Sequence, residues 1–175
     1  MRLCLIALMV LGAAPAHAEV VSASPNAFHV RQSVQLVVPQ DRAFDTFEQI
    51  GTWWDDEHTY SGAASNMRLA LQPGGCFCER LPDGGGVEHM RVAYVGPGER
   101  LVMTGSLGPL LYEGTSGAMD VRFERIAGGT RVTMDYKVAG FASGNAAELA
   151  PLVDQVLGTQ MQRYRQAARS APVTR

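Results

Sequence analysis

Hydrophobic and polar residues alternate with a period of two along most of the chain, which predicts an antiparallel β protein. In residues 28–39, Val30, Val34, Leu36 and Val38 fall on one face, as expected for a strand. Later segments repeat the alternation, at residues 67–75, 76–81, 86–95, 100–107, 117–126 and 130–140. The pattern predicts a curved antiparallel sheet of about six or seven strands.

Two segments have helical spacing instead. Residues 39–50 place Ala43, Phe44 and Phe47 on one face, and residues 51–62 follow as a short helix or loop. Residues 145–168 carry a longer apolar stripe, and at about 1.5 Å per residue such a helix reaches roughly 36 Å. We expect this long C-terminal helix to cover the apolar face of the sheet, because it is the only predicted element long enough.

An open end should remain where the sheet wraps around one helix. The two short helices after the first strand would cap that end, and a gap of this kind is a natural apolar pocket. The predicted fold class is therefore α+β, with a ligand-sized pocket between the sheet and the C-terminal helix.

The N-terminus has the pattern of a cleaved secretory signal. Arg2 precedes an apolar run, and small residues ending in Ala16-His17-Ala18 follow it. We assign residues 1–18 to a signal peptide and residues 19–175 to one domain. The nearly exclusive use of arginine over lysine suggests a GC-rich bacterial genome, so the expected location is the periplasm.

Composition narrows the classes of partner. The formal net charge is −2 at pH 7, so the chain lacks the basic surplus of a nucleic-acid-binding protein. No second long apolar run follows the signal, and we expect no transmembrane anchor in the mature protein. The sequence has no Gly-rich phosphate loop, no Ser-His-Asp set and no H-E-x-x-H motif, and we expect no cofactor.

The segment 74–90 is a predicted hairpin with unusual polar residues. With a turn at the Asp-Gly pair 83–84, Glu79 lies opposite Glu88, and Cys78 lies opposite His89. Alternation then places one set of residues toward the pocket: Phe77, Glu79, Leu81, Glu88, Met90, Val92 and Tyr94. It places another set on the outer face: Cys76, Cys78, His89 and Arg91.

On that hairpin, Glu79 and Glu88 are stronger candidates for a chemical role than the cysteines and His89. Two carboxylates that face each other in a pocket repel, so one of them should have a raised pKa and could serve as a general acid or base. The alternative is that both are solvated at the sheet edge or paired with arginines.

Cys76, Cys78 and His89 are weaker candidates for a soft-metal site. Three ligands on a flat strand face lack the fourth that zinc prefers. A disulfide within C-x-C would join strand neighbours near the upper limit of bridging distance. We expect small residues packed under a loop, with a metal or redox role as the alternative.

Further candidates line the expected pocket. His58 lies in an aromatic, loop-like setting and could donate or accept a proton near neutral pH. Residues 105–114 could form a gate or simply a wide loop. Core filling is the alternative role for the methionines. The full set of predicted ligand-binding residues is Trp53, Trp54, His58, Tyr60, Asn66, Glu79, Glu88, Met90, Met103 and Met119.

Several of these segments resemble the SRPBCC superfamily, the helix-grip fold of START lipid-transfer domains, birch-pollen allergen proteins and polyketide cyclases. The similar segments are "PQDRAFDTFEQIGTWW", "LQPGGCFCE", "LGPL" and "GGTRVTMDYKVAG". The chain is most similar to an exported bacterial branch labelled as polyketide cyclases or relatives of a chaperone-ATPase activator. The resemblance implies a cavity between the sheet and the long helix.

Three hypotheses for function follow. The first is binding or transport of a small hydrophobic or amphipathic molecule in the cell envelope. The second is a cyclase, dehydratase or hydrolase that uses His58 and Glu79 as acid and base. The third is an envelope protein-interaction module that uses the Cys76, Cys78 and His89 face.

Overall fold

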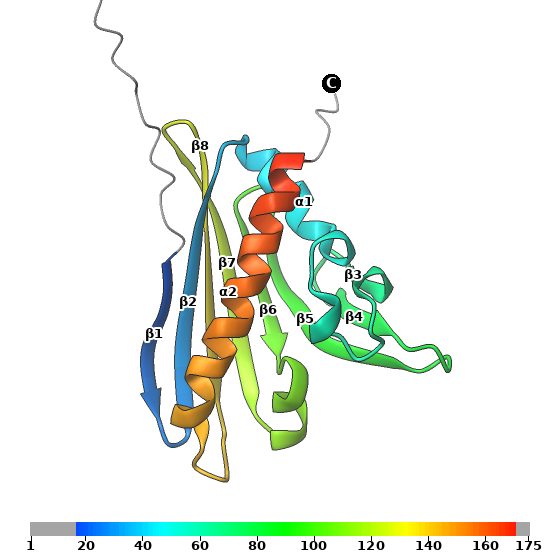
Figure 1. Ribbon diagram of the computed structural model, residues 1–175, viewed down its shortest axis with the longest axis vertical. Coiled ribbons are helices and arrows are strands. Elements are labelled where there is room, and N and C mark those ends of the chain that lie inside the picture. Colours follow the sequence, from blue (N-terminus) through cyan, green and yellow to red (C-terminus); the bar gives the residue numbers. More distant parts are fainter. Residues whose placement is uncertain (1–16, 171–175) are drawn as a thin grey trace, which may run out of the picture.

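The computed structural model describes residues 17–170, which form one eight-stranded antiparallel sheet with a long helix against it (Figure 1). The strands are β1 (His17–Ser24), β2 (Ala27–Leu36), β3 (Met67–Leu69), β4 (Cys76–Arg80), β5 (Gly86–Gly96), β6 (Arg100–Gly105), β7 (Ser116–Ile126) and β8 (Gly129–Ala139). The α-helices are α1 (Gln40–Glu48) and α2 (Ala146–Ser170). Short 3-10 helices lie in the connections: η1 (Ile50–Thr52), η2 (Asp56–His58), η3 (Ala64–Asn66) and η4 (Gly108–Glu113).

The expected α+β helix-grip architecture is confirmed, with one strand more than the sequence predicted. The additional strand is β1, which pairs with β2 from His17↔Ser33 to Ser24↔Ala27. Residues 19–24 are all exposed, so they carry no apolar alternation by which the strand could be recognised. The predicted signal peptide, residues 1–18, lies outside the described residues apart from its last two, whose backbone begins β1.

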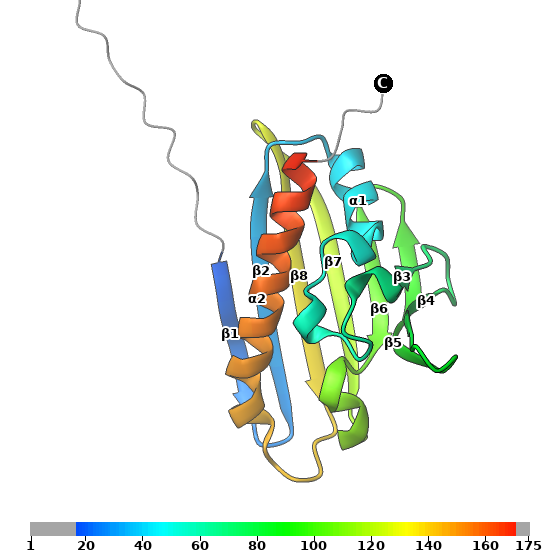
Figure 2. The same ribbon diagram turned by 45° about the vertical axis from the view of Figure 1, so that its right-hand side comes forward.

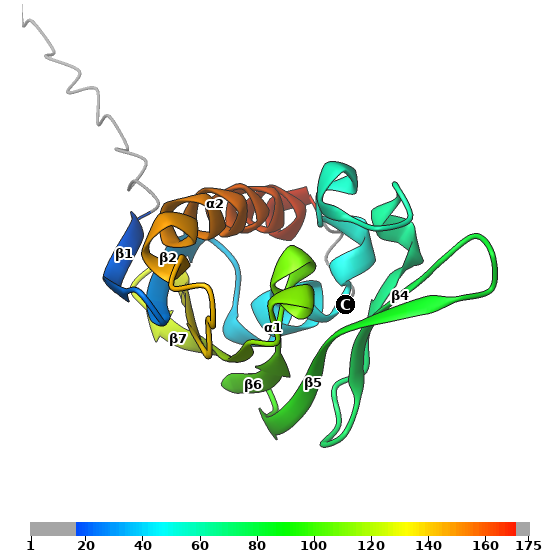
Figure 3. The same cartoon turned by 90° about the horizontal axis from the view of Figure 1, so that it is seen from below.

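The strand order is β1-β2-β8-β7-β6-β5-β4-β3, so the early strand β2 pairs with the last strand β8. That pairing runs from Ala27↔Ala139 to Leu36↔Thr130 without a shift in register. Helix α2 begins shortly after β8 and runs back across β2 and β1, as Figure 2 shows. Seen end-on in Figure 3, the sheet curves around α2.

Helix α2 buries one face against the sheet and α1. The buried residues follow helical spacing: Ala146, Ala150, Leu157, Gln160, Met161, Tyr164 and Ala168. The hydroxyl of Tyr164 donates to the carbonyl of Ala43 at 2.7 Å, which ties α2 to α1. Small residues at the two ends of this face and large ones in the middle let the helix lie close to the curved sheet.

An aromatic cluster fills the region between α1, η1 and α2. Phe47, Trp53 and Tyr164 pack against one another with ring centroids 5.3–5.4 Å apart. Trp53 is buried, and its indole N–H donates to the carbonyl of Thr46. The predicted short helices after the first long strand therefore belong to the core on this side. Within residues 17–170, no helix has the length and apolar character that crossing a membrane would require.

Candidate functional site

The hairpin formed by β4 and β5 contains a β-bulge that determines which side chains face the interior. Phe77 pairs with Met90, as predicted, but the next pair is Cys78 with Glu88 rather than with His89. His89 is therefore the extra residue of the bulge. One extra residue reverses the alternation of faces across the bulge, so Met90 and Val92 keep their predicted faces while the residues on the turn side of the bulge do not.

The predicted orientation of Glu88 and His89 was therefore wrong, and the two exchange places. Glu88 is exposed on the outer face, whereas His89 is buried. The expected pair of opposed carboxylates does not form, since Glu79 lies opposite Val87. A second shift in register, between Val92 and Tyr94, likewise turns Tyr94 outward, where half of its surface is exposed.

Glu79 and His89 form a buried pair. The Nε2 atom of His89 lies 3.0 Å from Oε2 of Glu79, and the two residues are 4% and 2% exposed. The backbone N–H of Tyr60 donates to the same carboxylate at 3.1 Å, and that of Ser61 donates at 2.5 Å. The ring of His89 packs against Phe77, with centroids 5.0 Å apart. A buried carboxylate that receives three hydrogen bonds is stable in its ionised form.

The surroundings of the pair favour an ionised glutamate and a neutral histidine. Burial alone would raise the pKa of Glu79, but hydrogen bonds from Ser61, Tyr60 and His89 together lower it. Burial lowers the pKa of His89, although Glu79 acts in the opposite direction. A neutral imidazole that donates its Nε2 proton to a carboxylate has an unprotonated Nδ1. Within residues 17–170, Nδ1 of His89 makes no hydrogen bond.

His89 lines a cavity of about 560 Å³ between the first half of α2, η4 and the segment 57–60. Among the described residues that line this cavity, His89 is the only buried titratable one. Its apolar wall comes mainly from α2 and η4: Leu149, Leu152, Val153, Val156, Leu157, Leu107, Pro109 and Leu110, with Trp54 beside them. The polar lining residues include five exposed ones, Glu57, His58, Tyr60, Tyr112 and Glu113, and the half-buried Asn145.

Tyr60 connects the Glu79–His89 pair to the cavity wall. Its backbone N–H donates to Glu79, and its hydroxyl donates to the carbonyl of Gly108, the first residue of η4, at 2.9 Å. Burial and the neighbouring Tyr112 hydroxyl raise the pKa of Tyr60 to about 12, so the hydroxyl keeps its proton. Gly108 and the η4 cap Gly114 have φ of 54° and 67°, values that favour glycine. Residues of the segment 105–114 line the cavity, so this segment forms part of its wall.

The predicted ligand-binding residues separate into three groups. Trp54, His58 and Tyr60 line the cavity, as proposed from the sequence. Trp53 and the predicted methionines do not line it, because they are buried in the core: Met90, Met103 and Met119. The remaining three lie elsewhere: Glu79 behind His89, Glu88 on the outer face, and Asn66 donating to the hydroxyl of Ser61.

His58 and Glu79, the predicted acid–base pair, have different partners. Nδ1 of His58 lies 3.8 Å from Oδ2 of Asp55 at the cavity rim. Glu79 instead contacts His89, which the sequence had placed on the opposite face. As cavity-lining residues, His89 and the α2 residues were not predicted: alternation placed His89 on the outer face as a weak metal-ligand candidate, and the α2 stripe was assigned to covering the sheet.

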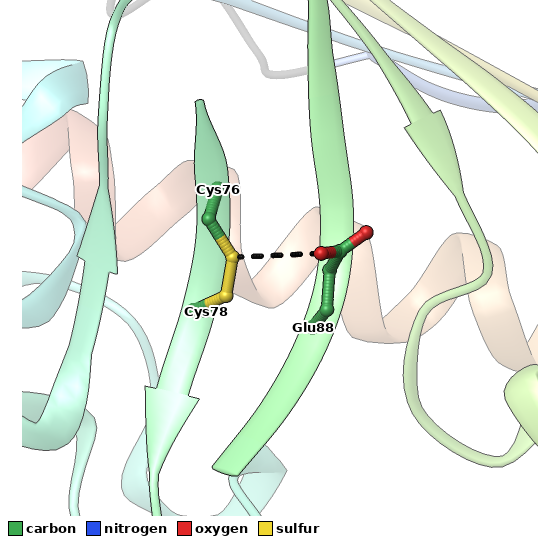
Figure 4. A group of neighbouring side chains, drawn as sticks. All are labelled: Cys76, Cys78 and Glu88. Carbon is green, nitrogen blue, oxygen red and sulfur yellow. Dashed lines mark hydrogen bonds between the residues drawn. A yellow bond between two sulfur atoms is a disulfide. The ribbon is translucent and has the colours of Figure 1, made fainter. Parts of the chain in front are cut away.

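On the outer face, Cys76 and Cys78 are joined by a disulfide (Figure 4). Their Cα atoms lie 5.3 Å apart, which is within normal bridging distance. The sequence left the redox state of these two cysteines open; in the structure they are bridged and half-buried. Oε2 of Glu88 lies 4.0 Å from Sγ of Cys76, so Glu88 replaces His89 as the third possible metal ligand in this group.

Comparison with solved structures supports the fold. An uncharacterized protein from Rhizobium leguminosarum matches with a TM-score of 0.63 and 19% identity, over 90% of this chain and all of that one. The di-domain aromatase/cyclase BexL of the BE-7585A biosynthetic pathway matches with a TM-score of 0.55 and 17% identity. StfQ, a di-domain aromatase/cyclase of the steffimycin pathway, matches with a TM-score of 0.54 and 13% identity.

The match to the two cyclases covers 86% and 83% of this chain but only 52% and 51% of theirs, so the chain spans about half of each. At these identities the likeness shows the fold alone. A scan against protein-family models and a search of curated proteins give no match. The class that the fold defines is a helix-grip protein with a cavity beside its long helix.

The Glu79→Gln variant should be markedly less stable than the wild type. Its amide NH2 would face backbone N–H groups that need an acceptor, so we expect a loss of about 2–4 kcal/mol in the free energy of unfolding. Urea denaturation followed by circular dichroism measures this loss. Glu88→Gln is the matched control and should change stability by less than about 0.5 kcal/mol, because Glu88 is exposed. Equal effects of the two substitutions would contradict the assignment of Glu79 as the buried carboxylate.

Stability should also fall on acidification in a way that depends on His89. The folded-state pKa of His89 is below its ordinary value of 6.5, so the unfolded chain binds more protons as the pH falls below that value. The free energy of unfolding should therefore decrease from about pH 6.5 downward. Glu79, whose pKa is also lowered, adds a second decrease below its ordinary value of 4.5.

Denaturation at a series of pH values, for the wild type and His89→Gln, tests this expectation. The glutamine amide can still donate to Glu79 but does not titrate near neutral pH. The decrease in the free energy of unfolding between about pH 6.5 and pH 4.5 should therefore be smaller in the variant. Parallel curves for the two proteins would show that His89 does not have a lowered pKa.

Proposed function

We propose that the protein binds a small, mainly apolar molecule in the cavity between α2, η4 and segment 57–60. The observation that carries the proposal is the composition of the cavity. Its wall is aliphatic and aromatic, and His89 is the one buried titratable residue among the described residues that line it. A volume of about 560 Å³ lies within the range of sites that hold drug-sized ligands.

His89 defines the polar end of the ligand in this proposal. Its Nδ1 atom would accept a hydrogen bond from a hydroxyl or phenol group, while Nε2 stays bonded to Glu79. The carboxylate fixes the tautomer and the orientation of the ring, as buried carboxylates do for functional histidines. The preferred ligand is thus an apolar body with one hydrogen-bond donor. We further propose that the protein acts in the cell envelope, because residues 1–18 have the pattern of a secretory signal peptide.

Binding can be measured with 1-anilinonaphthalene-8-sulfonate, an aromatic probe that fluoresces in apolar sites. Val153→Trp should weaken its affinity at least about tenfold, because the indole would occupy the cavity that Val153 lines. Val37→Trp is the control, since Val37 is 73% exposed and does not line the cavity. Equal probe affinity in both variants would place binding elsewhere. Native mass spectrometry of protein from its own host would identify a retained molecule.

A second candidate function is catalysis of the cyclase type on such a ligand. The Glu79–His89 pair favours it, because a neutral histidine held by a buried carboxylate can take a proton from a hydroxyl or an activated carbon. The carboxylate would stabilise the imidazolium that forms, and the proton would return to another position of the same ligand. Likeness in fold to BexL and StfQ is compatible with this chemistry.

His89→Gln separates binding from catalysis. If the protein is a carrier, loss of one hydrogen bond should weaken affinity by roughly 3-fold to 15-fold, with no turnover in either protein. If it is an enzyme, turnover of a poly-β-ketone or phenolic substrate should fall by about 10²–10⁴-fold, while affinity changes little. Unchanged affinity and unchanged turnover in this variant would overturn both roles for His89.

A further inference from the structure

The Cys76–Cys78 disulfide lies on the face of the sheet opposite the cavity, among charged side chains. On this outer face, Cys78 pairs in the sheet with Arg68 of β3 on one side and Glu88 of β5 on the other. Cys76 pairs with Arg91 of β5. Arg80 follows two residues after Cys78 and shares its face. The charged neighbours are all exposed, and both cysteines are half-buried, so solvent reaches this group.

This bridge contributes little to the stability of the fold. It joins residues only two apart in sequence, and they already occupy one strand of the sheet. Closing so short a loop removes little entropy from the unfolded chain. The strand register on either side is supplied by β3 and β5, so the folded state does not depend on the bridge.

The charges also distinguish between two uses of the cysteines. A metal ion would need both thiolates and Glu88, but Glu88 is already paired with Arg91 through two hydrogen bonds. Within residues 17–170, Arg68 and Arg80 form no ion pair, and their positive charge would repel a cation. Positively charged side chains near a cysteine pair favour thiolates and attract anions instead.

We propose that Cys76 and Cys78 form a redox-active pair that exchanges with small anionic thiols. Cys78 borders a cleft of about 380 Å³ whose other charged lining residues are Arg68, Arg80, Glu79 and Glu88, and this cleft would receive the incoming thiol. Glu79 is buried and its carboxylate is bonded to Tyr60, Ser61 and His89, so the two exposed arginines present the accessible positive charge. Cys76 does not line the cleft, which suits it to be the departing thiolate, and Arg91 lies opposite it in the strand register. Sγ of Cys76 lies 4.0 Å from Oε2 of Glu88, and the ion pair with Arg91 offsets the charge of that carboxylate. Arg91 is a positioning residue here, held by Glu88 and by the carbonyl of Gly74 at 2.9 Å.

The exchange has two steps. An external thiolate attacks Sγ of Cys78, the Cys76–Cys78 bond breaks, and Cys76 departs as a thiolate while a mixed disulfide forms at Cys78. A second external thiolate then attacks the sulfur of the bound thiol and releases Cys78 as a thiolate. The protein gains two electrons, and two external thiols are oxidised to one disulfide; the protons that they lose go to solvent or to the new cysteine thiols.

Three thiols of equal length but different charge test the proposal: 2-mercaptoethanesulfonate, 2-mercaptoethanol and cysteamine. Reduction is stopped with iodoacetamide, and the peptides with Cys76 and Cys78 are quantified by mass spectrometry. Rates are compared per thiolate. At low salt the anionic thiol should react roughly fivefold or more faster than the cationic one, and high salt should reduce this preference.

Substitutions locate the origin of that preference. The Arg68→Gln/Arg80→Gln double variant should lose most of it, whereas Arg122→Gln, an outer-face control on β7, should keep it. In the reduced protein, Arg91→Gln should shift the alkylation of Cys76 to higher pH. Circular dichroism should show that the reduced protein keeps its fold.

Four results would overturn the proposal. The disulfide could resist all three thiols until the protein unfolds, or it could react with no preference for charge. The preference could persist in the double arginine variant. Finally, the reduced protein could take up one Zn²⁺ tightly in a chelator competition, which would identify the group as a metal site.

Discussion

The buried carboxylate of Glu79 is the constraint on which the arrangement of the site depends. An ionised group at 2% exposure must receive hydrogen bonds, because leaving it unpaired would cost several kcal/mol. Two of the donors are consecutive backbone N–H groups, of Tyr60 and Ser61, which requires the segment between η2 and η3 to fold over β4. The third donor is His89 on β5, so the carboxylate joins a loop and two strands.

The position of the loop in turn determines the cavity. Tyr60, whose N–H is bonded to Glu79, also donates from its hydroxyl to the carbonyl of Gly108, so this residue links the carboxylate to η4. The apolar wall comes from α2 and η4, and the Glu79–His89 pair, joined to η4 through Tyr60, lies behind it. Substitution at Glu79 should disturb both stability and cavity shape for this reason.

Much of the fold could be predicted from the sequence, because it depends on periodicity. The long stripe of residues 145–168 and the alternation in β2, β7 and β8 correspond to observed elements, and the pocket at the open end of the sheet follows from them. β1 could not be found, since its residues 19–24 are all at least partly exposed and show no alternation of buried and exposed positions. A disulfide between Cys76 and Cys78 looked unfavourable from the ideal spacing of strand neighbours two apart. The observed Cα–Cα distance of 5.3 Å is shorter and lies within bridging distance.

The site was predicted less well, because a rule of period two assumes a regular strand. One trace of the bulge does exist: the outward charges Glu88 and Arg91 are three residues apart, not two or four. The bulge also has an evolutionary consequence. Deleting a single residue from the first part of β5 would exchange the faces of Glu88 and His89 while leaving the composition almost unchanged. Relatives that keep both residues but differ by one position in this strand should therefore not share the site, and an alignment of sequences by residue type alone would group them together.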